Sequence, residues 1–175
     1  MKGLNHNALT RSAVPISPCE RSLQTVEAQP YFSVSEASLV LEGAVFDRNN
    51  NLLFVDVVTG RVFKLTPERQ LSIVLKENTF GASGLAVHKD GRIFIASVGD
   101  MQRGSVRAIE PDGTREQMVV APDAGFLVND LVFDNQGGFY FTDSRGNSAD
   151  PQGGVFYVSP NVGSIHTILP GLAVG

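Results

Sequence analysis

The chain has 175 residues, a formal net charge of −4 and 42% hydrophobic residues, a composition that can bury the core of a globular domain. Because Lys and Arg form no run, we expect no nucleic-acid partner. Residues 1–18 contain no apolar stretch long enough for a signal peptide or a membrane helix. These features predict no membrane association and a cytoplasmic location, and the single Cys19 lacks the partners that a disulfide or a zinc site needs.

Short runs of β-branched and aromatic residues, separated by many of the 18 Gly and 9 Pro, predict an all-β chain of short strands and tight turns. Residues 1–38 show no repeated pattern. We expect a leader there that packs on the rest of the chain, with one strand near Gln24–Val26. The repeated part is residues 39–175.

Three segments of the repeated part share one pattern without gaps: an apolar strand, a polar turn, a second apolar strand and a final Asp or Ser. The copies are residues 42–56, 83–97 and 129–143. The turns contain Asn50-Asn51, Asp90-Gly91 and Gly137-Gly138, residue pairs that supply the positive φ of a tight hairpin. The pattern therefore predicts one β-hairpin in each copy.

Each hairpin is followed by a third apolar run and a candidate fourth strand. The third strands are expected at residues 61–65, 105–109 and 154–158, and the fourth at residues 71–75, 115–120 and 164–169. Four antiparallel strands at a period of 41 and then 46 residues are typical of a β-propeller blade. Residues 39–175 are therefore predicted to form three blades of a β-propeller, which we expect to be incomplete.

Three acidic or basic repeat positions have a structural interpretation. Asp56 and Asp143 end the second strands of their copies, where a buried carboxylate commonly accepts backbone N–H bonds from a loop. His88 stands at the start of a hairpin turn, in the position that Asp47 and Asp134 hold, and is predicted to be a turn residue. There is no GxSxG motif, which argues against a serine hydrolase of the usual kind.

The starts of the innermost strands are the predicted functional positions, because they converge at the mouth of a propeller channel. Glu42, Ser83 and Asn129 are equivalent there. A carboxylate, a hydroxyl and an amide offer oxygen ligands without imidazole or thiolate, a set that suits Ca²⁺, or else Mg²⁺ or Mn²⁺. The alternative is that Glu42 is a solvated acid at a strand end and Asn129 a turn cap.

The sequence resembles the gluconolactonase, senescence-marker-protein and luciferin-regenerating-enzyme family, above all its bacterial drug-responsive lactonase branch. The likeness extends from about Ser12 to Gly175. The runs that carry it are Leu41–Gly43, His88–Phe94, Leu131–Asp134, Gly137–Asp143, Arg145-Gly146 and Gly153–Pro160. The resemblance implies a six-bladed propeller that hydrolyses a lactone ester with Ca²⁺, or alternatively Mg²⁺, Mn²⁺ or Zn²⁺, in its channel.

Carried over by residue, the resemblance implies that Glu42 is a metal ligand and that Asn129 binds either metal or substrate. Leu127 stands where the gluconolactonase branch has an Arg for its sugar, so a plainer lactone is expected. A second calcium site of the lactonase branch would fall near Gly104, Asp123 and Phe126.

The family's proton-transferring Asp and a further Asn ligand would both follow Gly175, so we expect no catalytic residue within the chain itself. The chain is thus expected to be the N-terminal part of a calcium-dependent lactonase, inactive alone and able to self-associate through open propeller ends. The competing hypothesis is a non-enzymatic propeller segment, or a pseudo-enzyme, that binds metal or a partner.

Overall fold

The computed structural model describes residues 29–76 and 81–172. The chain divides into two compact units, Met1–Ser33 and Val34–Gly175. In the first unit only residues 29–33 are described, and they form neither helix nor strand. The strand predicted near Gln24–Val26, and with it most of the predicted leader, lies outside the described residues.

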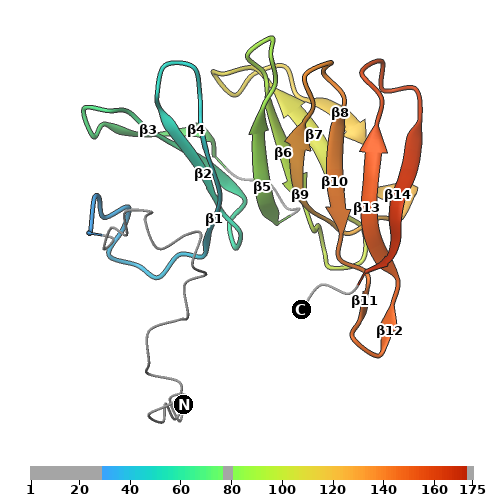
Figure 1. Cartoon of the computed structure of the whole chain (residues 1–175). Coiled ribbons are helices and arrows are strands. Elements are labelled where there is room, and N and C mark those ends of the chain that lie inside the picture. Colours follow the sequence, from blue (N-terminus) through green and yellow to red (C-terminus); the bar gives the residue numbers. More distant parts are fainter. Residues whose placement is uncertain (1–28, 77–80, 173–175) are drawn as a thin grey trace, which may run out of the picture. The chain divides into compact units, whose positions relative to one another are not determined.

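The second unit contains three four-stranded antiparallel sheets, each with its strands in sequential order (Figure 1). We call them blades 1, 2 and 3. Blade 1 consists of β1 (Leu41–Phe46), β2 (Leu52–Asp56), β3 (Arg61–Leu65) and β4 (Leu71–Leu75). Blade 2 consists of β5 (Ala82–Val87), β6 (Ile93–Ser97), β7 (Ser105–Ile109) and β8 (Gln117–Val120). Blade 3 consists of β9 (Val128–Phe133), β10 (Phe139–Asp143), β13 (Gly153–Val158) and β14 (Ile165–Leu172). All twelve strands predicted for residues 39–175 are present.

The structure departs from the predicted elements mainly in four places. A two-stranded hairpin, β11 (Gly146–Asn147) and β12 (Asp150–Pro151), interrupts blade 3, and a 3₁₀ turn, η1 (Pro122–Ala124), precedes β9. Strand β8 begins after the predicted Arg115, which has a φ of +51° that ends extended structure. Strand β14 continues beyond the predicted Leu169 to Leu172.

The hairpin between the first two strands of each blade has a three-residue loop closed by backbone hydrogen bonds. In blade 2 the His88 N–H donates to the Arg92 carbonyl at 2.9 Å, and the Gly91 N–H donates to the His88 carbonyl at 2.9 Å. The last loop residue has a positive φ in every copy: 60° at Asn50, 101° at Gly91 and 99° at Gly137. This is the turn with a bulge at its end that Gly and Asn favour, and it confirms the predicted turn positions.

The core lies between neighbouring blades, where two clusters of buried apolar side chains form. One joins blades 1 and 2 through residues such as Leu53 and Ile95, and the other joins blades 2 and 3 through residues such as Phe94 and Phe141. A third, smaller cluster lies within blade 1, where Val34 and Leu39 pack against Phe54, Phe63 and Leu65. The residues just before β1 therefore cover part of the side of blade 1 that faces away from blade 2. Among the described residues, no helix is long and apolar enough to cross a membrane.

Candidate functional site

Glu42, Ser83 and Asn129 occupy structurally equivalent positions in the three blades. Each follows the residue that pairs with the end of the second strand: Leu41 with Asp56, Ala82 with Ser97, and Val128 with Asp143. The equivalence assumed from the sequence repeat is thus also an equivalence of strand register.

A β-bulge lies at this position in all three inner strands. Each inner strand has six residues and each partner strand five. The register shifts after Glu42 in blade 1, across Ser83 in blade 2, and across Asn129-Asp130 in blade 3. A bulge changes the direction of the side chains around it and is frequent beside functional sites. The sequence repeat did not reveal this bulge.

The inner strands β1, β5 and β9 pack closely against one another in sequential order. A Cβ atom on Gly43 would lie 2.9 Å from the Leu85 nitrogen, and a Cβ atom on Gly84 would lie 2.6 Å from Asp130 Oδ1. The Ser83 hydroxyl donates to the Val128 carbonyl of blade 3 at 3.3 Å. The three candidate residues therefore lie on adjacent strands whose backbones approach as closely as glycine permits.

The candidate side chains differ in exposure and in hydrogen bonding. Glu42 is exposed, and nothing among the described residues forms a hydrogen bond or an ion pair with its carboxylate. Ser83 and Asn129 are half-buried, and the Ser83 hydroxyl also lies 3.4 Å from the Ala96 carbonyl. No three His, Cys, Asp or Glu side chains gather as a metal site within residues 29–76 and 81–172. A cation bound by these three residues alone would thus depend on the Glu42 carboxylate and on neutral oxygens.

Asp130 is an acidic residue at this place that the sequence reasoning missed. It is exposed, its Oδ1 accepts the Leu131 N–H at 2.8 Å, and its own N–H donates to the Thr142 hydroxyl at 3.1 Å. It holds the repeat position of Gly43 and Gly84. The sequence feature that could have identified Asp130 is an acidic residue at a repeat position that is glycine in the other two copies.

Asp143 fixes the chain just before Asn129. It is fully buried and accepts the Leu127 N–H at 2.9 Å, and it pairs with the Arg145 guanidinium at 2.7 Å. The Ser144 N–H also donates to the Leu127 carbonyl at 2.9 Å. Both backbone groups of Leu127 are therefore held by the end of β10, as predicted for this carboxylate.

Asp56 does the same for the start of β1. It is fully buried and accepts the Val40 N–H at 3.1 Å and the Thr59 hydroxyl at 2.6 Å. Burial acts to raise the pKa of Asp56, but these donors and the Thr59 N–H together hold it below its usual range. The carboxylate is charged at neutral pH and holds the residue two positions before Glu42.

The predicted second calcium site is only partly assembled. The Gly104 N–H donates to the Phe126 carbonyl at 2.7 Å, so these two residues are in contact. Asp123 is exposed on η1, and within the described part of the chain its carboxylate makes no hydrogen bond or ion pair. The backbone of Ser97 adjoins Gly104, and the buried hydroxyls of Ser97 and Ser105 find no protein partner among the described residues.

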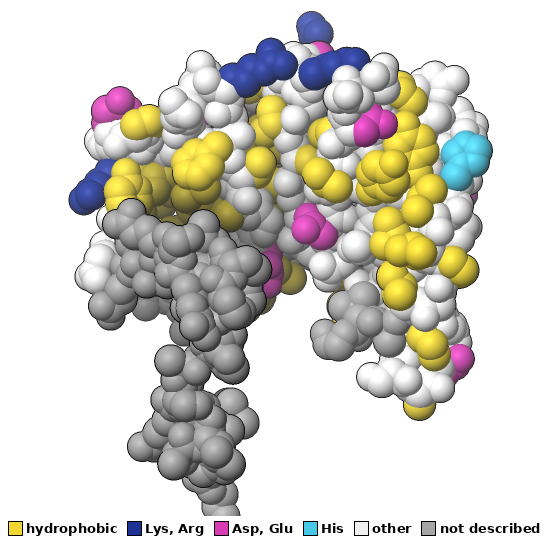
Figure 2. All heavy atoms as spheres, in the orientation of Figure 1, with side chains coloured by type: hydrophobic (Ala, Val, Ile, Leu, Met, Phe, Trp, Pro, Cys, Tyr) yellow, Lys and Arg dark blue, Asp and Glu magenta, His cyan; other side chains and the backbone are white. Residues whose placement is uncertain are grey.

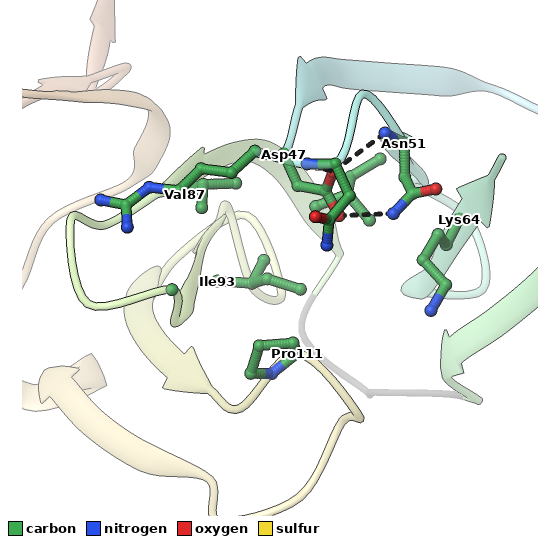
Figure 3. A pocket seen from close by; sticks show the side chains of 10 residues that line it. Asp47, Asn51, Lys64, Val87, Ile93 and Pro111 are labelled. Carbon is green, nitrogen blue, oxygen red and sulfur yellow. Dashed lines mark hydrogen bonds between the residues drawn. The ribbon is translucent and has the colours of Figure 1, made fainter. Parts of the chain in front are cut away.

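A cleft of about 300 Å³ lies between blades 1 and 2, at the hairpin end of β1 (Figure 3). Asp47 lines it and accepts the Asn51 N–H at 2.9 Å and the Asn51 side-chain amide at 2.8 Å. Lys64, Val87, Ile93 and Pro111 also line the cleft and are labelled in Figure 3. Glu42 is five residues earlier on the same strand, roughly 15 Å away at the usual strand rise, so this cleft is not the predicted site.

The sequence is similar to a known protein family. Residues 40–174 match the model of the SMP-30/Gluconolactonase/LRE-like region. The protein named lactonase drp35 from Staphylococcus haemolyticus (strain JCSC1435) is 37% identical over 174 residues, which are 98% of this chain and 53% of that protein.

Solved structures agree on the fold. A gluconolactonase from Xanthomonas campestris superimposes with a TM-score of 0.63 and 20% identity, over 76% of this chain and 48% of that one. Regucalcin from Agrobacterium tumefaciens, described as a calcium-binding protein, gives a TM-score of 0.60 and 15% identity, over 78% of this chain and 45% of that one. The chain therefore spans about half the length of these proteins, and its blades have the β-propeller fold. Since the family model covers most of its residues, the chain belongs to the SMP-30/gluconolactonase/LRE-like family.

Proposed function

We propose that Glu42 and Asn129 contribute oxygen ligands to a divalent-cation site at which a lactone ester is hydrolysed, and that Ser83 lines the same channel. The observation that carries this proposal is the common bulge, which sets three oxygen-bearing side chains at one position of adjacent inner strands. The lactonase named among the relatives supports the reaction class.

Ca²⁺ is the proposed ion, because hard oxygen donors without imidazole or thiolate suit it best. The description of regucalcin as a calcium-binding protein supports this choice. Mg²⁺, Mn²⁺ and Zn²⁺ are the alternatives. The group near Gly104, Asp123 and Phe126 is proposed as a second, separate calcium site, with a backbone carbonyl and one exposed carboxylate as its donors.

A cation bound in the channel would supply Lewis-acid polarisation of the lactone carbonyl. Glu42 would provide the negative charge that retains the ion, and the neutral Asn129 amide would coordinate it or orient the ester. Leu127, whose backbone is held by Asp143 and Ser144, is an apolar residue two positions before Asn129. We infer that a lactone with an apolar body fits better than a sugar lactone.

The cytoplasmic location and the inactivity of the 175-residue chain on its own stay predictions, and neither bears on whether Glu42 binds the ion.

Calorimetric titration of the chain with Ca²⁺ tests the proposal. Because ligand charge sets calcium affinity, Glu42→Gln should weaken binding by well over about tenfold. Glu68→Gln removes another exposed acid, in the loop between β3 and β4, and should leave the affinity unchanged. Competition by Mg²⁺, Mn²⁺ and Zn²⁺ identifies the preferred ion.

Hydrolysis of a simple aromatic-fused γ-lactone is measured in the same preparations. Any turnover should require the cation and Glu42. Unchanged Ca²⁺ affinity in Glu42→Gln, or turnover that survives both this variant and a chelator, would show that the metal centre lies elsewhere.

A further inference from the structure

The contact between one blade and the next is built twice in the same way. The second strand contributes Leu53 in blade 1 and Phe94 in blade 2, which are 1% and 4% exposed. Each belongs to the core cluster that its blade shares with the following blade. By strand register the equivalent residue of blade 3 is Tyr140, and it is 38% exposed.

The rest of this face of blade 3 is also uncovered among the described residues. Val132 is 61% exposed, whereas its equivalents Val45 and Ala86 are at least partly buried in the clusters between blades. A groove of about 160 Å³ follows the face, lined by Asp130, Leu131, Val132, Tyr140, Phe141, Thr142 and Val155. Figure 2 shows hydrophobic side chains over the strands of blade 3 in the orientation of Figure 1. The face has the composition of a contact between blades, and no described residue covers it.

In each contact between blades, the following blade contributes its inner strand. In blades 2 and 3 the inner strands use Val87 and Phe133 to pack on the preceding blade. The equivalent residue on β1 is Phe46, which is 65% exposed, and Leu41 at the start of the same strand is 43% exposed. Val34 and Leu39 cover the neighbouring strands of blade 1 but leave this inner strand uncovered.

One aromatic pair within the chain shows the geometry that a contact between the two uncovered surfaces would have. Phe94 of blade 2 and Phe133 of blade 3 pack edge to face, with ring centroids 4.8 Å apart. Tyr140 is the equivalent of Phe94, and Phe46 is the equivalent of Phe133. A blade-like contact between two copies of the chain would therefore pair Tyr140 of one copy with Phe46 of the other.

We propose that the β9–β10 face of blade 3 docks β1 of a second copy of this chain, in the same geometry by which β9 packs on blade 2. Two copies related by a two-fold axis can form this contact twice. Tyr140 of the first copy then meets Phe46 of the second, and Tyr140 of the second copy meets Phe46 of the first. The occupant is a second copy because the chain itself carries the inner strand that the face is shaped to receive.

The test is the mass of the 175-residue chain by light scattering after size-exclusion chromatography, over a dilution series. The unmodified chain should show twice its 18.8 kDa mass at high concentration and dissociate on dilution. Tyr140→Lys and Phe46→Glu should each give the monomer mass, because each places one unpaired charge in the contact. The double variant Y140K/F46E should recover the dimer, since Lys then faces Glu.

Val58→Lys is the matched control: Val58 is 76% exposed in the turn between β2 and β3, outside both surfaces, and its variant should remain dimeric. Circular dichroism verifies that all variants keep their strands. A chain that stays monomeric at every concentration overturns the proposal. A dimer that is lost in Tyr140→Lys but kept in Phe46→Glu also overturns it, because the blade 3 faces of the two copies would then meet directly. Mass that stays above the monomer in all variants means nonspecific association and overturns it equally.

Discussion

The close packing of the inner strands makes a specific prediction about Gly43. Its φ is +62°, and a Cβ atom there would lie 2.9 Å from the Leu85 nitrogen and 3.0 Å from the Gly84 Cα. Both obstacles are backbone atoms of blade 2, which cannot move aside as a flexible side chain can. Gly43→Ala should therefore combine backbone strain with displacement of one blade from the next.

Gly91 separates these two contributions. Its φ is +101°, but a Cβ atom there would meet nothing within 4 Å. Gly91→Ala should cost about 1–2 kcal/mol of unfolding free energy, the usual strain of an L residue at positive φ. Gly43→Ala should cost that amount plus about 1–3 kcal/mol for overpacking. A branched side chain in Gly91→Val should cost on the order of 1 kcal/mol or more.

Urea denaturation followed by circular dichroism measures the three variants against the unmodified chain. Calcium titration of the same proteins adds a second readout, because Gly43 adjoins Glu42 and Gly91 belongs to a hairpin at the other end of blade 2. Affinity should fall in Gly43→Ala and hold in Gly91→Ala. Equal stability losses in Gly43→Ala and Gly91→Ala would refute the reasoning, since they would mean that β1 and β5 do not pack as closely as the structure indicates.

Two further predictions concern the carboxylates that support the blades. Asp56→Asn should cost about 1–3 kcal/mol, because the partly buried donors of Val40 and Thr59 lose their charged acceptor. The pKa of Asp56 is below 3.8 in the folded state, so its contribution is complete above about pH 4 and is lost as the pH falls through that folded-state pKa. The urea midpoints of Asp56→Asn and the unmodified chain should approach each other in acid. A difference that does not change with pH would contradict the role of the charged Asp56 carboxylate. The Tyr157 hydroxyl donates to Asp134 at 2.7 Å, and this bond raises the pKa of Tyr157 above 10.0. Ultraviolet titration should show one tyrosine whose midpoint falls toward 10.0 in Asp134→Asn, and an unchanged titration would mean that the bond is absent in solution.

The strands were predictable because their signals are local. Alternating apolar residues and the turn chemistry of Asn50, Gly91 and Gly137 fix each hairpin without reference to the rest of the chain. The hairpin of β11 and β12 was not predictable in this way, because two-residue strands have no period to detect. The start of β8 was misplaced because the φ of Arg115 depends on its turn and not on its residue type.

The candidate site was predictable in position but not in geometry. A comparison among repeats reveals what differs between copies, and Asp130 stands out only when it is set against Gly43 and Gly84. A feature that all copies share leaves no such difference. The bulge in every inner strand is of this kind, and the ungapped repeat concealed it.

The spacing of the buried residues along the inner strands nevertheless indicates the bulge. Ala82 and Leu85 both belong to the cluster between blades 1 and 2, and Val128 and Leu131 both belong to the cluster between blades 2 and 3. Residues three apart on a regular strand point to opposite faces, so one additional residue must intervene in each case. Because the bulge occupies the interval between two positions that both pack on the preceding blade, Ser83 and Asn129 fall within it. Polar side chains can occupy these two positions without displacing apolar side chains from the core. A ligand site can therefore be built where the bulge interrupts the alternation of inward- and outward-facing residues.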